Sequence, residues 1–172
     1  MTAAAVAALA AILGILVGRF WDNRSEASRW RRDLKTMSYQ RFAEQYHRVY
    51  EGIRELALAD RDKVELNALH QRVRGEYFAG WDSALAVVWL HGSADVLAAA
   101  TLVDRASVDL YAKAVTDQIP TWQQFEKERV SLRQAFEEFL AAARRELHLP
   151  TAQMTFFWDT DLPELGERDR SS

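Results

Sequence analysis

The pair Glu44-x-x-His47 is the one arrangement in this sequence that suggests metal chemistry. Di-iron helical bundles use a Glu and a His three residues apart on each of two helices, plus a Glu from each of the other two helices. This chain has no second Glu-x-x-His. The pair also lies off the apolar seam through Phe42, Tyr46 and Val49. We therefore expect a solvated pair with no metal and no cofactor, and keep a di-metal bundle enzyme as an alternative.

Other signatures of catalysis are missing from the sequence. It contains no cysteine, no P-loop, no Gly-x-Gly-x-x-Gly and no Gly-x-Ser-x-Gly, so thiolate, nucleotide and acyl-transfer chemistry have no support. His91 ends an apolar segment, where a histidine commonly bonds the last carbonyls of a helix. We predict a protein that is not an enzyme.

The N-terminal segment Thr2–Gly18 is uncharged, and the rest of the chain is attached to its C-terminal end. As a helix extended through Phe20 and Trp21 it would be about 30 Å long, which is the thickness of a membrane's hydrocarbon core. We predict a transmembrane anchor over residues 1–21. Two alternatives stay open, namely a cleaved signal peptide and a buried helix of a soluble fold.

The residues that flank the segment predict its orientation. Arg19, Phe20, Trp21 and Arg24 form the expected membrane interface, because aromatic and basic side chains gather there. Further basic residues follow as far as Lys35, whereas only the α-amino group precedes the span. The positive-inside rule then places the N-terminus outside and the remainder in the cytoplasm of the cell. The basic residues could also bind anionic lipid head groups.

Small residues recur every fourth position in the anchor, at Ala10, Gly14 and Gly18. In a bilayer this spacing lets two helix backbones approach closely. It predicts a homo-oligomer formed through the membrane helix.

The rest of the chain is expected to be all-α. The sequence has 172 residues but only 7 Gly and 3 Pro, too few for many turns or Gly-rich loops. Apolar residues at heptad-like spacing, together with a Thr121-x-x-Gln124 capping box, predict four helices. The apolar stripe of the first helix is Tyr39, Phe42, Tyr46, Val49, Ile53 and Leu56, continued upstream by Trp30, Leu34 and Met37, and that of the last is Phe125, Leu132, Phe136, Phe139 and Ala143. Short connections favour an antiparallel up-down-up-down four-helix bundle over residues 22–149. The expected helices span residues 25–59, 64–91, 94–116 and 121–148.

Aromatic residues suggest two further contact sites. Tyr77, Trp81, Leu85 and Trp89 could line an apolar pocket, or their tryptophans could lie at the membrane or in the core. The tail over residues 150–172 carries Phe156, Phe157 and Trp158 before an acidic stretch. We expect it to be partly disordered, and to contact a partner protein or fold back onto the bundle.

The chain resembles a loose class of uncharacterised actinobacterial single-pass membrane proteins with a helical-bundle domain. The resemblance rests on the stretches WRRDLKTMSYQRFAEQYHRVYEGI, HGSADVLAAATLV and FEEFLAAARRELHL, and covers about Arg19–Leu149. It implies the anchor-and-bundle architecture and no activity.

These observations together predict a membrane-anchored, non-catalytic interaction or scaffold protein. Its expected partners are the lipid bilayer and an unidentified protein. A net charge of −3, despite the basic N-terminal region, argues against nucleic acid. A small-ligand or lipid-binding helical bundle is the alternative.

Overall fold

A computed structural model describes the backbone of residues 2–60, 65–116, 119 and 121–150, and the side chains in these ranges except those of residues 2–25, 27 and 28. All regular structure in the described part is α-helical, which confirms the predicted fold class at that level. The helices are α1 Thr2–Ala57, α2 Leu66–Glu76, α3 Trp81–His91, α4 Ala94–Val115, α5 Trp122–Glu128 and α6 Val130–Glu146.

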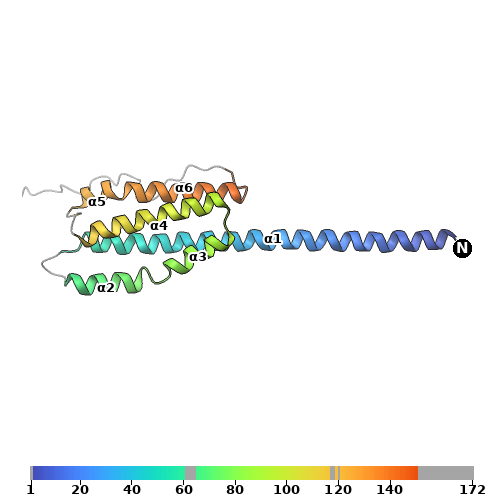
Figure 1. Ribbon diagram of the computed structural model, residues 1–172, viewed down its shortest axis with the longest axis horizontal. Coiled ribbons are helices and arrows are strands. Elements are labelled where there is room, and N and C mark those ends of the chain that lie inside the picture. The colour runs from blue at the N-terminus through green and yellow to red at the C-terminus, as the bar shows by residue number, and fades with distance from the viewer. Residues whose placement is uncertain (1, 61–64, 117–118, 120, 151–172) are drawn as a thin grey trace, which may run out of the picture.

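The helices after α1 pack along its C-terminal half (Figure 1). The chain runs one way in α1, returns through α2 and α3, runs outward again in α4, and returns through α5 and α6. The N-terminal half of α1 extends beyond the other helices. The ends of α3 and α6 and the start of α4 therefore meet at the end of the bundle from which α1 projects, which we call the stalk end.

The predicted apolar seams form the core. Phe42 packs its ring on Trp81 and on Phe139, with ring centroids 5.0 and 4.7 Å away. Tyr46 stacks on Phe136 at 3.7 Å. The seam of α1 is buried throughout, as its spacing predicted, at Tyr39, Phe42, Tyr46, Val49, Ile53 and Leu56. The stripe predicted for the last helix is buried as well, at Phe125, Leu132, Phe136, Phe139 and Ala143.

The single helix predicted over 64–91 is wrong, because residues 77–80 separate α2 from α3. The break lets two consecutive aromatic residues pack on different helices. The ring of Tyr77 lies so close to Gly52 of α1 that a Cβ there would be 2.7 Å from it, while Phe78 packs edge-on against Tyr111 of α4. Gly80 approaches the Gln45 side chain equally closely. Tertiary packing thus overrides the helical pattern of the sequence.

The single helix predicted over 121–148 is divided as well, but only at Arg129. Arg129 keeps an αR conformation, and helical backbone bonds of 3.0 Å enter and leave it. The N-cap half of the predicted capping box is confirmed, since the Thr121 hydroxyl accepts a bond from the backbone amide of Gln124, while the Gln124 side-chain amide donates to Glu128. α5 and α6 therefore behave as one return leg with a small irregularity.

A left-handed residue ends α6. His148 has φ of 55°, and the amides of His148 and Leu149 donate to the carbonyls of Arg145 and Arg144. This pattern is a Schellman motif, which usually has glycine at the left-handed position because glycine has no Cβ to clash.

We expect His148→Gly to raise the free energy of unfolding by about 1 kcal/mol, since it removes the cost of a left-handed non-glycine residue. Denaturant titration of the full chain measures this, with His148→Ala as the control that keeps a Cβ. A gain for alanine as large as that for glycine would rule out the backbone explanation.

Candidate functional site

The Glu44–His47 pair lies on the outer side of α1, away from the buried seam. Both residues are exposed on α1, and Glu44 accepts a hydrogen bond of 3.0 Å from the Gln40 amide. Among the described residues no group of three or more His, Asp or Glu side chains is arranged to hold a metal ion. The geometry matches a solvated pair.

The most developed polar cluster lies at the stalk end and is centred on Glu146 of α6. Its carboxylate accepts a 2.5 Å bond from the Tyr39 hydroxyl and a 3.2 Å bond from the backbone amide of Ser93, and it forms an ion pair with Lys35. The side chain of Glu146 is only 12% exposed. These bonds join α1, the residue before α4 and the end of α6. We call the four residues the Glu146 cluster.

Burial and hydrogen bonding within the Glu146 cluster shift the pKa values of Glu146 and Tyr39 in opposite directions. Burial disfavours the charge on Glu146, but the bonds from Lys35, Tyr39 and Ser93 outweigh it, so the pKa of Glu146 is lowered. Burial, followed by the bond to Glu146, raises the pKa of Tyr39 well above its usual value. Tyr39 therefore stays a neutral donor and Glu146 a charged acceptor at neutral pH, which suits a structural clasp better than acid-base catalysis.

A second polar contact supports the same end of the bundle. The Ser38 hydroxyl lies 2.7 Å from Nδ1 of His91, and it also donates to the Leu34 carbonyl at 2.7 Å. His91 therefore holds the end of α3 against α1. The sequence had instead predicted that the His91 ring would bond the last carbonyls of its own helix.

The four residues predicted to line an apolar pocket have different surroundings. Trp81 is buried in the core, where its indole N–H donates to Asp104 over 2.7 Å, and Leu85 is buried beside the same core. Tyr77 packs on Gly52 and donates to Glu55, whereas Trp89 is 55% exposed. The helix break at residues 77–80 separates Tyr77 from the other three.

Of these four residues, only Tyr77 lines either of two surface hollows. One, of about 480 Å³, lies between α1 and α2, and its charged groups are paired with each other: Arg54 with Glu51, and Arg72 with Glu55. The other, of about 370 Å³, lies between α4 and α6. Its floor is made mainly of alanines, and its charged lining is Asp95, Glu138 and Arg145.

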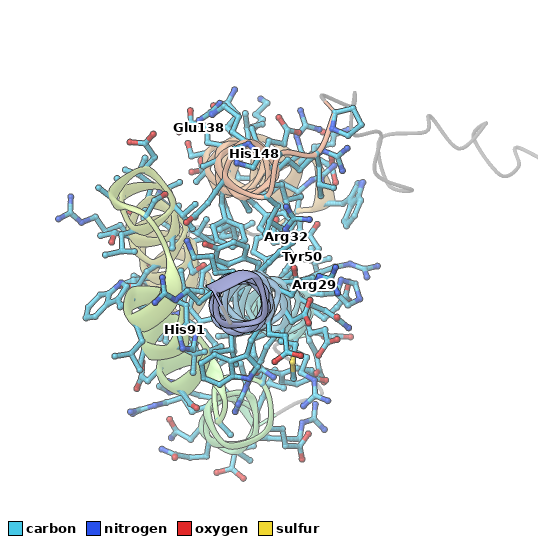
Figure 2. The ribbon with its side chains drawn as sticks, turned by 90° about the vertical axis from the view of Figure 1, so that its right-hand side faces the viewer. Arg29, Arg32, Tyr50, His91, Glu138 and His148 are labelled. Atoms are coloured by element: carbon cyan, nitrogen blue, oxygen red, sulfur yellow. The ribbon has the colours of Figure 1, made fainter. Side chains whose placement is uncertain are left out.

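Large apolar side chains are exposed around the stalk end. Trp30 and Met37 of α1 are 65% and 66% exposed, and Leu90 in the last turn of α3 is 78% exposed. Arg29, Arg31 and Arg32 are exposed on the same stretch of α1. Figure 2 looks along α1 from its N-terminal end, with α3 and α4 on one side of it and Arg29, Arg32 and Tyr50 toward the other. The apolar spacing of the sequence predicts that the α1 seam continues upstream through Trp30 and Met37, but both side chains are exposed, so this extension of the seam is wrong.

The remaining predicted site residues lie outside the part whose side chains the structure describes. They are Ala10, Gly14, Gly18, Arg19, Phe20, Trp21, Arg24, Phe156, Phe157 and Trp158. Among the residues whose side chains the structure describes, no helix has the length and apolar character of a membrane span. The side chains of the predicted anchor, residues 1–21, lie outside that part of the chain.

Comparison with known proteins gives no relative from which a role could be transferred. No protein-family model, no curated protein and no solved structure matches the chain significantly.

Proposed function

We propose that the protein is a membrane-anchored, non-catalytic interaction protein. Residues 1–21 would cross the membrane once, and an antiparallel bundle, in which α2–α3 and α5–α6 each form one return leg, would stand in the cytoplasm. The observation that carries the proposal is the continuity of α1, a single helix from Thr2 to Ala57 whose N-terminal half extends away from the other helices (Figure 1).

The physical reason is the apolar character of the projecting helix. Thr2–Gly18 has no charged side chain, and transferring apolar surface out of water is favourable by about 25 cal/mol per Å². Helices of the bundle do not extend along this stretch (Figure 1). A bilayer would cover all sides of such a helix, and the helix is long enough to cross the hydrocarbon core. The basic residues Arg19 and Arg24 that follow favour the cytoplasmic orientation.

The continuous helix also fixes the distance between bilayer and bundle. From Trp21 to Lys35, where α1 pairs with α6, a helix rises about 20 Å. With α1 standing upright, the exposed residues nearest the membrane surface among those whose side chains are described would be Glu26, Arg29, Trp30, Arg31 and Arg32. Trp89 would lie too far away for the interfacial position predicted from the sequence. Arg29, Arg31 and Arg32 would then contribute to attraction for anionic head groups.

The polar groups of the bundle hold helices together or pair with each other, which favours a role in protein contacts over catalysis. The Glu146 cluster holds helices together, and the charged groups of the α1–α2 hollow are paired. Exposed Trp30, Met37 and Leu90 offer apolar contact area to a partner protein. The small residues Ala10, Gly14 and Gly18 would support self-association within the bilayer.

Cysteine labelling tests the anchor and its orientation together. The chain has no native cysteine, so Thr2→Cys and Lys127→Cys each supply one thiol in the full chain. With a membrane-impermeant maleimide applied to bacterial spheroplasts, we expect Thr2→Cys to be labelled and Lys127→Cys to be labelled only after lysis. Lys127 is exposed in the bundle, so detergent lysis is the control for reactivity. Labelling of Lys127→Cys from outside would contradict the orientation.

A further inference from the structure

The end of α6 directs the following chain toward one side of the bundle. After the left-handed His148, the carbonyl of Pro150 accepts bonds from Nε and Nη2 of Arg144, at 3.1 and 2.5 Å. Pro150 is thus turned back beside α6, next to a residue six positions earlier. The sequence then continues from Thr151 to Ser172, and it starts from the side of α6 that carries Arg144.

The side of α6 that carries Arg144 forms a mixed apolar and basic face together with α1. By helical periodicity, Leu140, Glu137 and Arg133 share the stripe of Arg144. The register set by the Tyr46–Phe136 and Tyr39–Phe139 contacts places Ala43 of α1 opposite the turn of α6 that immediately precedes Leu140, with His47 one turn further along α1. Ala43 and Leu140 are both half-buried against the core. We call Ala43, His47, Arg133, Leu140 and Arg144 the α1–α6 face.

The α1–α6 face and the α4–α6 hollow lie on opposite sides of α6 and differ in charge. The face carries Arg133, Arg144 and His47, with Glu137 as the carboxylate on the same stripe, 3.5 Å from Arg133, and Glu44 is exposed one turn from His47 on α1. The hollow carries two carboxylates, Asp95 and Glu138, and one basic residue, Arg145. The face is therefore less negative than the hollow, and an anionic segment is favoured on the face over the hollow.

The tail has the complementary composition. Phe156, Phe157 and Trp158 are followed by Asp159, Asp161 and Glu164. Six extended residues after Pro150 reach at most about 20 Å, which corresponds to about thirteen residues of helix. The aromatic residues can therefore reach any position on α6 between Arg144 and Arg133.

We propose that the segment from Phe156 to Asp161 docks on the α1–α6 face of its own bundle. The aromatic side chains cover Ala43 and Leu140, and the carboxylates lie beside Arg133 and His47. The tail is then a tethered ligand, held at an effective concentration in the millimolar range. A partner that recognises the same aromatic and acidic sequence must displace the tail from this face. Docking of the tail on this face does not require the membrane anchor.

Disulfide trapping in the full, detergent-solubilised chain tests the docking site. Thr155→Cys is combined with Ala43→Cys on the α1–α6 face, or with Ala98→Cys in the α4–α6 hollow as a matched alanine control. Under mild oxidation with oxidised glutathione, we expect the intramolecular bond to form about tenfold faster with Ala43→Cys than with Ala98→Cys. The bond is detected by gel mobility without reductant and by the mass of the linked peptide.

Further variants identify the cause of docking. Adding Trp158→Ala or Arg133→Glu to the Ala43 pair should lower its rate to that of the Ala98 pair, whereas Ser171→Ala should leave the rate unchanged. Equal rates for the two pairs, or a faster Ala98 pair, would overturn the proposal. Disulfides between two chains in place of the intramolecular bond would also overturn it, because the tail would then dock on a second copy.

Discussion

Replacing Phe42 by alanine is expected to lower the free energy of unfolding by about 4 kcal/mol. The side chain is fully buried, and it contacts Trp81 of α3 and Phe139 of α6. Alanine would remove the ring that joins three helices and would leave a cavity between rigid aromatic neighbours. Denaturant unfolding of the full chain, followed by tryptophan fluorescence, measures the change.

Met37→Ala is the matched control for Phe42→Ala, because Met37 lies on the same helix but is 66% exposed. We expect it to change the free energy of unfolding by less than about 0.5 kcal/mol. Similar losses of unfolding free energy for the two variants would mean that the aromatic core around Phe42 does not stabilise the bundle.

The second large effect is expected for Glu146. Glu146→Ala removes the shared acceptor of Lys35, Tyr39 and the Ser93 amide. All three donors lose a charged acceptor, but Lys35 is partly exposed, so water can replace part of its interaction. We therefore expect a loss of about 2 kcal/mol at neutral pH. Glu138→Ala, an exposed position on the same helix, is the control and should lose less than about 0.5 kcal/mol.

The pH dependence of Glu146 has a definite sign. Its pKa is lowered in the folded chain from an ordinary value of 4.5, so its charge stabilises the fold fully above the unfolded pKa. That contribution is lost as the pH falls through the lowered folded pKa. The stability difference between the parent chain and Glu146→Gln should therefore be constant near neutral pH and shrink below about pH 4.5. A difference that grows on acidification would contradict this assignment.

The parts of the fold that the sequence predicted are those determined by local pattern. Heptad-like spacing identified the buried residues of α1 and of the last leg, and Thr121-x-x-Gln124 identified a helix start. The break at residues 77–80 was not predictable in this way. It depends on the close approach of Tyr77 to Gly52 and of Gly80 to Gln45, which are contacts between residues far apart in the sequence.

The polar clasp at the stalk end escaped prediction for the same reason. Glu146 and Tyr39 are 107 positions apart, and no periodic signal links a carboxylate on one helix to a hydroxyl on another. Packing also decides which side chains are buried within the single helix α3. Trp81 and Trp89 belong to the same apolar run, but Trp81 is 4% exposed and Trp89 is 55% exposed, because the packing of α3 on its neighbours decides which side is buried.

The most direct test of the proposed membrane anchor is the intact mass and fractionation of the full chain expressed in a bacterial host. We predict a full-length mass, recovered in the membrane fraction and retained there after an alkaline wash. A matched variant, Leu9→Arg with Leu13→Arg, places two charges in the span and should move the chain to the soluble fraction. A soluble or exported chain shortened by about twenty residues would instead indicate a cleaved signal peptide and contradict the anchor.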